Sequence, residues 1–100
     1  MAYDLNAAVK RKLNITWSDG ETDMRIADVI ATVAPAVARV VALDVDSAKL
    51  TDDAETRGLV VNACFYEWSH ALDDFWGNYA DDIQRCRIKH EMEAARVVPS

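Results

Sequence analysis

The stretch Asp19–Ala42, DGETDMRIADVIATVAPAVARVVA, carries the strongest helical pattern in the chain. Its large aliphatic side chains recur every three or four residues, which places them on one side of a helix. This aliphatic stripe contains Ile26, Val29, Ile30, Val33, Val37, Val40 and Val41. A second stripe beside it contains Ala27, Ala31, Ala34, Ala38 and Ala42. Because alanines let another helix approach closely, we expect this long helix to contact two different neighbours.

The residues that precede the long helix predict a shorter one. Asp4 can cap a first helix that ends near Asn14, after a basic last turn that suits the helix dipole. Ser18 and Glu21 then have the spacing of a capping box, in which each side chain satisfies a free backbone N–H group. The long helix is therefore expected to begin at about Asp19.

The second half of the chain predicts two more helices. One runs from Ala54 to about Trp76, and the other begins at Tyr79. Gly77 either separates the two helices or lies within one long continuous helix. Residues 43–53 form a connector, in which Thr51, Asp52 or Asp53 can cap the third helix. Strand signals are nearly absent. We therefore predict an all-α single domain over residues 1–100: a small bundle of about four helices, two of them long, with an extended C-terminal tail.

The composition is that of a globular domain whose core is limited by its size. The chain has 100 residues, of which 51% are hydrophobic, with three Gly and two Pro. A domain of this length buries roughly two thirds of its unfolded surface. Neither a signal-peptide pattern nor an apolar run of about 18 residues occurs, so we expect no membrane partner. Cys64 and Cys86 are too few for a disulfide framework, which indicates free thiols in a reducing cytosol.

Charge is distributed unevenly along the chain. The formal net charge is −6, which repels nucleic acid and anionic membranes. Residues 52–82 contain eight acids against a single base, Arg57. The segment that follows reverses the sign, with Arg85, Arg87 and Lys89 close together.

No motif of a catalytic, metal or cofactor site is present in the sequence. Cys86 and His90 have the i, i+4 spacing of two metal ligands, but no third ligand stands at a workable spacing, so both are expected on a packing face. The acidic pairs Asp73–Asp74 and Asp81–Asp82 diverge by about 100° around a helix and cannot converge on one ligand. We expect no enzyme and no cofactor, and assign these acids to a solvated or channel-facing surface.

Aromatic side chains crowd the third predicted helix. Phe65, Trp68 and Phe75 are expected in the core of the domain. Trp76 and Tyr79 lie beside Gly77, where they serve either the core or an interface with a partner.

The last helix is apolar on two sides. Ile88 and Met92 point away from the side that carries Cys86 and His90. We expect Ile88 and Met92 to contact a partner, because a lone subunit of this size cannot bury both sides. Other copies of the chain, or an adjoining protein, are predicted to cover the excess apolar surface.

The order of these elements resembles a known family. The segment Leu13–Asp19, LNITWSD, is followed by Glu21–Asp23, a long helix and an aromatic-rich helix with Phe75 and Tyr79. This pattern is similar to that of the head-tail connector (adaptor, head-completion) proteins of long-tailed double-stranded DNA bacteriophages. The resemblance covers most of the chain, and LNITWSDGETD is its most specific part.

The resemblance implies a structural virion protein without catalytic activity. Its subunits would form a ring, commonly of twelve copies, between the capsid portal and the next neck or tail-completion protein. Double-stranded DNA would pass through the channel of this ring without specific binding. The protein would assemble in the host cytoplasm and reside at the head-tail interface of the virion.

The resemblance also implies roles for two sets of residues. A C-terminal arm would reach the portal; in this chain the arm consists of Arg96, Val97, Val98, Pro99 and Ser100. If a ring forms, its channel needs a wall to which DNA does not adhere. The candidates for that wall are Asp73, Asp74, Asp81 and Asp82.

A second interpretation belongs to a different functional class. Small phage DNA-binding proteins that initiate genome packaging are also helical and form rings. That function requires a basic recognition helix, and the best candidate segment is Arg85–Lys89. The same segment carries part of a packing stripe, which favours the connector interpretation.

Overall fold

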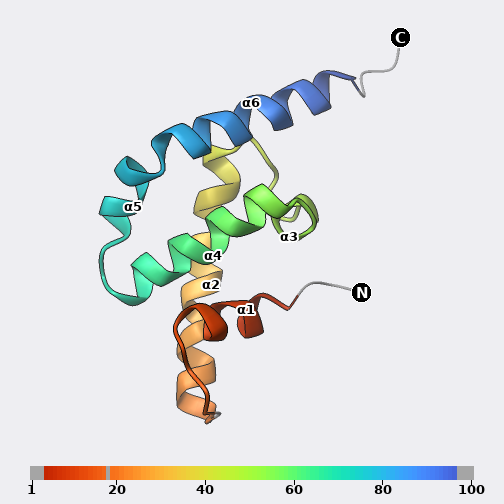
Figure 1. Cartoon of the computed structure of the whole chain (residues 1–100). Helices are drawn as coiled ribbons and strands as arrows, with labels where there is room; N and C mark the ends of the chain where they lie inside the picture. Colours follow the sequence, from red (N-terminus) through yellow and green to blue (C-terminus); the bar gives the residue numbers. More distant parts are fainter. Residues whose placement is uncertain (1–3, 18, 97–100) are drawn as a thin grey trace.

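The computed structural model describes residues 4–17 and 19–96, which form six α-helices and no strand (Figure 1). The helices are α1 (Leu5–Lys12), α2 (Gly20–Val40), α3 (Lys49–Asp52), α4 (Ala54–Trp68), α5 (Leu72–Asn78) and α6 (Ala80–Arg96). The predicted all-α class is confirmed, with six helices in place of about four. None of these helices is both long enough and apolar enough to span a bilayer.

Aspartates begin the first two helices. Asp4 accepts a hydrogen bond from the Ala7 N–H group at 3.0 Å, as predicted for the cap of α1. Asp19 caps α2 by accepting from the Thr22 N–H group at 2.7 Å and from the Thr22 hydroxyl at 2.9 Å. The predicted start of the long helix is thus confirmed, with Asp19 as its cap; Ser18 lies outside the described residues.

Three helices end on a residue with left-handed backbone geometry, and none of these residues is glycine. Asn14, Ala42 and His70 have φ angles of 59°, 62° and 59° after α1, α2 and α4. At each end the next N–H group bonds back into the last turn, as from Ala71 to the Tyr66 carbonyl at 2.8 Å. This arrangement satisfies carbonyl groups that the helix leaves free.

The end at His70 corrects one prediction. The helix expected from Ala54 to about Trp76 is divided, because α4 ends at Trp68 and α5 begins at Leu72. Gly77 lies inside α5 rather than at a break, and only Tyr79 separates α5 from α6. The connector also differs from expectation, since its last residues form the short helix α3.

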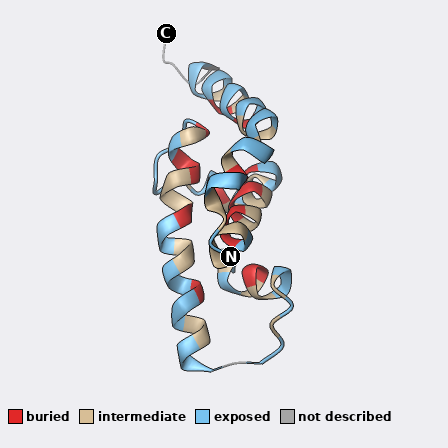
Figure 2. Ribbon diagram, turned by 90° about the vertical axis from the view of Figure 1, so that its left-hand side faces the viewer, coloured by how far each residue is buried: buried red, intermediate tan, exposed pale blue. Residues whose placement is uncertain are grey.

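The core lies mainly between α2 and α4, which pack against each other (Figure 2). Its fully buried members include Val9, Ile26, Val33, Val37, Ala38, Val41, Val60, Ala63, Cys64 and Phe75. The expectation that α2 contacts two neighbours is confirmed, because it packs against both α1 and α4. Only part of the alanine stripe is used: Ala38 is buried, whereas Ala27 and Ala31 are exposed.

Phe75 is the centre of the aromatic cluster. Its ring is fully buried and stacks on Tyr79 at a centroid distance of 4.6 Å. Edge contacts join it to Trp76 at 5.2 Å and to Tyr66 at 5.7 Å. The prediction for Phe65 was wrong, since this residue is 39% exposed.

The position of Phe65 follows from the helix geometry of α4. Val60, Ala63 and Cys64 occupy the side of α4 that faces the core, and Phe65 lies about 100° further around the helix than Cys64. The Lys12 ammonium lies 5.7 Å from its ring centroid, which is within the range of a cation–π contact. Trp68 is partly buried, and the Arg25 guanidinium covers its ring at 4.1 Å.

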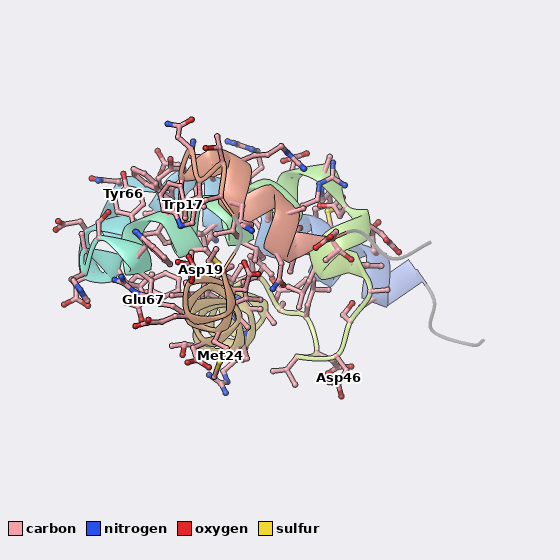
Figure 3. All side chains as sticks on the ribbon, turned by 90° about the horizontal axis from the view of Figure 1, so that it is seen from below. Trp17, Asp19, Met24, Asp46, Tyr66 and Glu67 are labelled. Carbon is pink, nitrogen blue, oxygen red and sulfur yellow. The ribbon has the colours of Figure 1, made fainter. Side chains whose placement is uncertain are left out.

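The molecule is flat, with principal extents of 51 × 32 × 17 Å. Packed helices lie about 8–10 Å apart, so a thickness of 17 Å corresponds to two helix layers. Each layer therefore has an outer side with no helix over it. Met24 on α2, which is 70% exposed, points away from the body in this way (Figure 3).

We predict that Phe75→Ala lowers the free energy of unfolding by about 3–5 kcal/mol, because it removes a fully buried ring and its aromatic contacts. Phe65→Ala is the matched control and should cost about 1 kcal/mol, since that ring is already partly in water. Urea unfolding followed by circular dichroism measures both values. Equal losses for the two variants would contradict this assignment of the core.

Candidate functional site

The candidate site is the surface of α6, which is buried on one side and open on the other. Cys86 and His90 form the buried side, each only 2% exposed, which confirms the predicted packing face. Ile88 and Met92 lie on the opposite side and are 46% and 55% exposed. The structure thus places these two predicted contact residues on one accessible surface.

The C-terminal half of α6 extends beyond the other helices (Figures 1 and 2). Beside Ile88 and Met92, a shallow hollow of about 340 Å³ is lined by Arg85, Lys89 and Glu93 as well. Arg96, which was expected in an extended arm, is the last residue of α6. The other arm residues, Val97, Val98, Pro99 and Ser100, lie outside the described residues.

The other two predicted interface residues, Trp76 and Tyr79, are partly buried in the chain itself. Both pack against Phe75, and Tyr79 also contacts Tyr66 at a centroid distance of 5.9 Å. Asn78 donates a long hydrogen bond of 3.4 Å to the Tyr66 hydroxyl. Trp76 and Tyr79 therefore support the base of α6 from within, and do not share the open surface of Ile88 and Met92.

The predicted channel-lining acids begin two consecutive helices. Asp73 and Asp74 lie in the first turn of α5, and Asp81 and Asp82 lie in the first turn of α6. Negative charge is favourable there because it faces the positive end of the helix dipole. Asp82 forms an ion pair with Arg85, whereas the other three carboxylates are exposed.

A polar cluster at the start of α4 holds α6 in place, and sequence reasoning missed it. Asp53 caps α4 by accepting from the Thr56 N–H group at 3.1 Å and from the Thr56 hydroxyl at 2.7 Å. The same carboxylate accepts from the Lys89 ammonium, with both oxygens at 2.9 Å. Thr56 Oγ1 lies 2.8 Å from His90 Nε2.

His90 continues this cluster along α6. Its Nδ1 donates a hydrogen bond of 3.0 Å to the Glu93 carboxylate, which can only accept. Lys49 of α3 lies 3.5 Å from the same carboxylate, so α3 joins the cluster too. We call Asp53, Thr56, Lys89, His90 and Glu93 the α4–α6 cluster. Among the described residues, no buried side-chain polar atom lacks a hydrogen-bond partner.

Charge in the α4–α6 cluster is balanced by short-range contacts. Burial by itself raises the pKa of Asp53, but hydrogen bonds from Thr56 and Lys89 outweigh it and lower that pKa to about 2. The hydrogen bond from His90 lowers the pKa of Glu93, and the bonds to Asp53 raise the pKa of Lys89. The folded chain therefore favours the charged forms of Asp53, Lys89 and Glu93.

The i, i+4 pair Cys86 and His90 faces the interior of the chain. Both ring nitrogens of His90 are engaged, by Thr56 and by Glu93. Within residues 4–17 and 19–96, no group of three or more potential ligands is arranged to hold a metal ion. Burial raises the pKa of the Cys86 thiol and raises that of Cys64 to about 12, so neither thiol is activated.

The three basic residues of the segment Arg85–Lys89 are each paired with neighbouring acids. Arg85 pairs with Asp82 and lies 3.9 Å from Glu55. Arg87 lies 3.7 Å from Glu91 one turn later. Because Lys89 is held by Asp53, the segment Arg85–Lys89 offers no strongly basic surface to a phosphate backbone.

One sequence signal could have located part of this cluster. The segments Asp19–Thr22 and Asp53–Thr56 share the pattern D-x-E-T, and both fold into the same cap. The pattern identifies Asp53 as the cap of α4 among the three candidates. It does not reveal His90, which is 34 residues away from Thr56.

No family model, curated protein or solved structure matches this chain. The site is therefore interpreted from its own geometry. It exposes Ile88 and Met92 on one side of α6, and the polar residues of the α4–α6 cluster are engaged in contacts between helices.

We predict that Asp53→Ala lowers the free energy of unfolding by about 2 kcal/mol at pH 7, because it removes both a helix cap and the partner of Lys89. Asp19→Ala is the matched control, with the same cap but exposed and without a lysine partner, and should lower the free energy of unfolding by less than Asp53→Ala does. Urea unfolding at pH 7 measures the free energy of unfolding of each variant and of the wild type.

The pH dependence gives the sharper test of the Asp53 assignment. Because its folded pKa of about 2 lies below the ordinary value of 3.8, its stabilisation is present above about pH 4. That stabilisation is lost as the pH falls through 2. The wild type and Asp53→Ala should therefore converge in acid, and a constant difference from pH 7 to pH 2 would contradict the assignment.

Proposed function

We propose that this chain is a structural subunit of a phage head-tail connector, which forms a ring between the capsid portal and the tail. The observation that supports the proposal most strongly is the way in which α6 is attached to the body and exposed to solvent. This helix is fixed to the body along Cys86 and His90, exposes Ile88 and Met92 on its other side, and extends beyond the bundle. Such a helix is built to present a surface to another protein.

The flat shape of the subunit supports assembly with other copies. A body of two helix layers leaves apolar residues on its outer sides, among them Met24 of α2 and Ile88 and Met92 of α6. A ring buries surfaces of this kind without leaving a free edge, because each copy is covered by the next. The resemblance suggests twelve copies, with the portal on one side and the next neck or tail-completion protein on the other.

The charge distribution supports a passage for DNA rather than a binding site for it. The net charge is −6, and Asp73, Asp74 and Asp81 are exposed. We assign these residues and Asp82 to the channel wall, where like charges keep the duplex from adhering. In this proposal the protein assembles in the host cytoplasm and stays in the virion, without enzymatic activity.

The alternative, a DNA-binding protein that initiates packaging, is less well supported. It requires a basic recognition helix, and the three cations of Arg85–Lys89 are paired with carboxylates. A duplex titration at low salt separates the two functions. Tight binding that falls steeply with salt would favour the alternative.

We predict that a chain truncated after Ala95 keeps its fold but no longer binds the portal protein of the same virus. The fold survives because the buried side of α6 ends at His90, whereas the proposed arm, residues 96–100, is removed. Circular dichroism and thermal unfolding check the first part, and co-sedimentation with the portal checks the second. Wild-type binding by the truncated chain would refute the arm.

A further inference from the structure

A second surface remains after the site on α6 has been described. An open hollow of about 480 Å³ lies between α1 and α4. Arg11 and Lys12 of α1 line it on one side, and Arg57 and Asn62 of α4 line it on the other. Small or aliphatic residues complete its lining, and no acidic residue belongs to it. We call this surface the basic hollow.

The basic hollow differs from the segment Arg85–Lys89 in the surroundings of two of its cations. Within the described part of the chain, neither Arg11 nor Lys12 has a carboxylate partner, and the Lys12 ammonium lies over the Phe65 ring instead. By contrast, the neighbouring Lys10 pairs with Asp23 at 2.9 Å. The chain as a whole has a net charge of −6, but this surface is locally positive. It therefore favours contact with a negatively charged group of another molecule.

The chain itself carries a protrusion of complementary charge and shape. The connector after α2 exposes Asp44, Val45 and Asp46, and Val45 is 47% exposed between the two acids. Figure 3 shows Asp46 projecting at the outer end of this loop, on the side of the molecule away from α1. We call residues 44–46 the acidic loop.

From these two surfaces we infer that the acidic loop of one copy inserts into the basic hollow of the next. The two aspartates would face Arg11, Lys12 and Arg57, while Val45 would meet the apolar part of the lining. The inference rests on the proposed ring and names one of the contacts between its copies. Because loop and hollow are different surfaces of one chain, the contact is head-to-tail, and contacts of this type form a ring when the rotation between successive copies closes.

The geometry favours a second copy over a nucleic acid as the occupant. The overall field of the molecule repels a polyanion, whereas a short loop approaches only the local positive charge. The aliphatic and small lining residues, among them Ala8 and Val61, also suit a valine better than a phosphate backbone.

The test exchanges the charges of the two surfaces. One variant, Arg11→Glu/Lys12→Glu, makes the hollow acidic; the other, Asp44→Lys/Asp46→Lys, makes the loop basic. Each variant alone should associate at least about tenfold more weakly than the wild type, because like charges would meet. An equimolar mixture should recover association, because each reversed surface then finds an opposite partner.

Sedimentation velocity at low and high salt, up to millimolar chain, measures these associations. Two matched controls should associate like the wild type: Arg11→Lys/Lys12→Arg, which keeps the charge of the hollow, and Asp28→Lys, which changes an exposed acid of α2 that belongs to neither surface. Circular dichroism confirms that each variant is folded.

Several results would overturn this contact. The first is a wild-type chain that stays monomeric at millimolar concentration. The second is normal association of either charge-reversed variant alone. The third is a mixture of the two variants that associates no better than each variant by itself. Duplex DNA that binds the wild type but not Arg11→Glu/Lys12→Glu would assign the hollow to phosphate instead. If the variants assemble normally on the portal, only this contact fails; if the associated wild type does not bind the portal, the connector function fails.

Discussion

The hydrogen bonds that Asp53 accepts from Thr56 and Lys89 determine where the last helix lies. The carboxylate begins α4, and the same two oxygens hold a lysine of α6, so one residue sets both the start of one helix and the position of another. Thr56 extends the contact to His90, which is buried against the body. A polar cluster of this kind is costly to leave half satisfied, and it therefore favours a single orientation of α6.

This constraint explains the accessible surface of the protein. Because α6 is attached along one side only, Ile88 and Met92 stay open and the end of the helix extends away from the bundle. The molecule is only 17 Å thick along its shortest axis, too thin to bury both sides of its helices. In the proposed connector, other copies and a neighbouring protein would cover these surfaces.

Parts of the fold could be predicted from the sequence because their signals are local. The bounds of α2 follow from a long periodic pattern and an aspartate cap, and they agree with the structure to within two residues. The division between α4 and α5 could not be predicted, because His70 adopts a positive φ angle and nothing about a histidine predicts that geometry. Phe65 was assigned to the core for its size, although its angle on α4 turns it outward.

The candidate site was predictable to a similar degree. The open side of α6 follows from the spacing of Ile88 and Met92, whereas the cluster that holds the other side joins residues more than thirty positions apart. Trp76 and Tyr79 illustrate the same limit. Their aromatic character suited a core and an interface equally, and only their contacts with Phe75 show that they pack within the chain.

Amide hydrogen exchange of the wild type and of His90→Ala tests the role of the α4–α6 cluster most directly. The substitution removes the buried link between Thr56 and Glu93 and leaves the core between α2 and α4 untouched. Faster exchange confined to α6, with α2 and α4 as protected as before, is the predicted result. Unchanged exchange in α6, or an equal acceleration in every helix, would contradict the account.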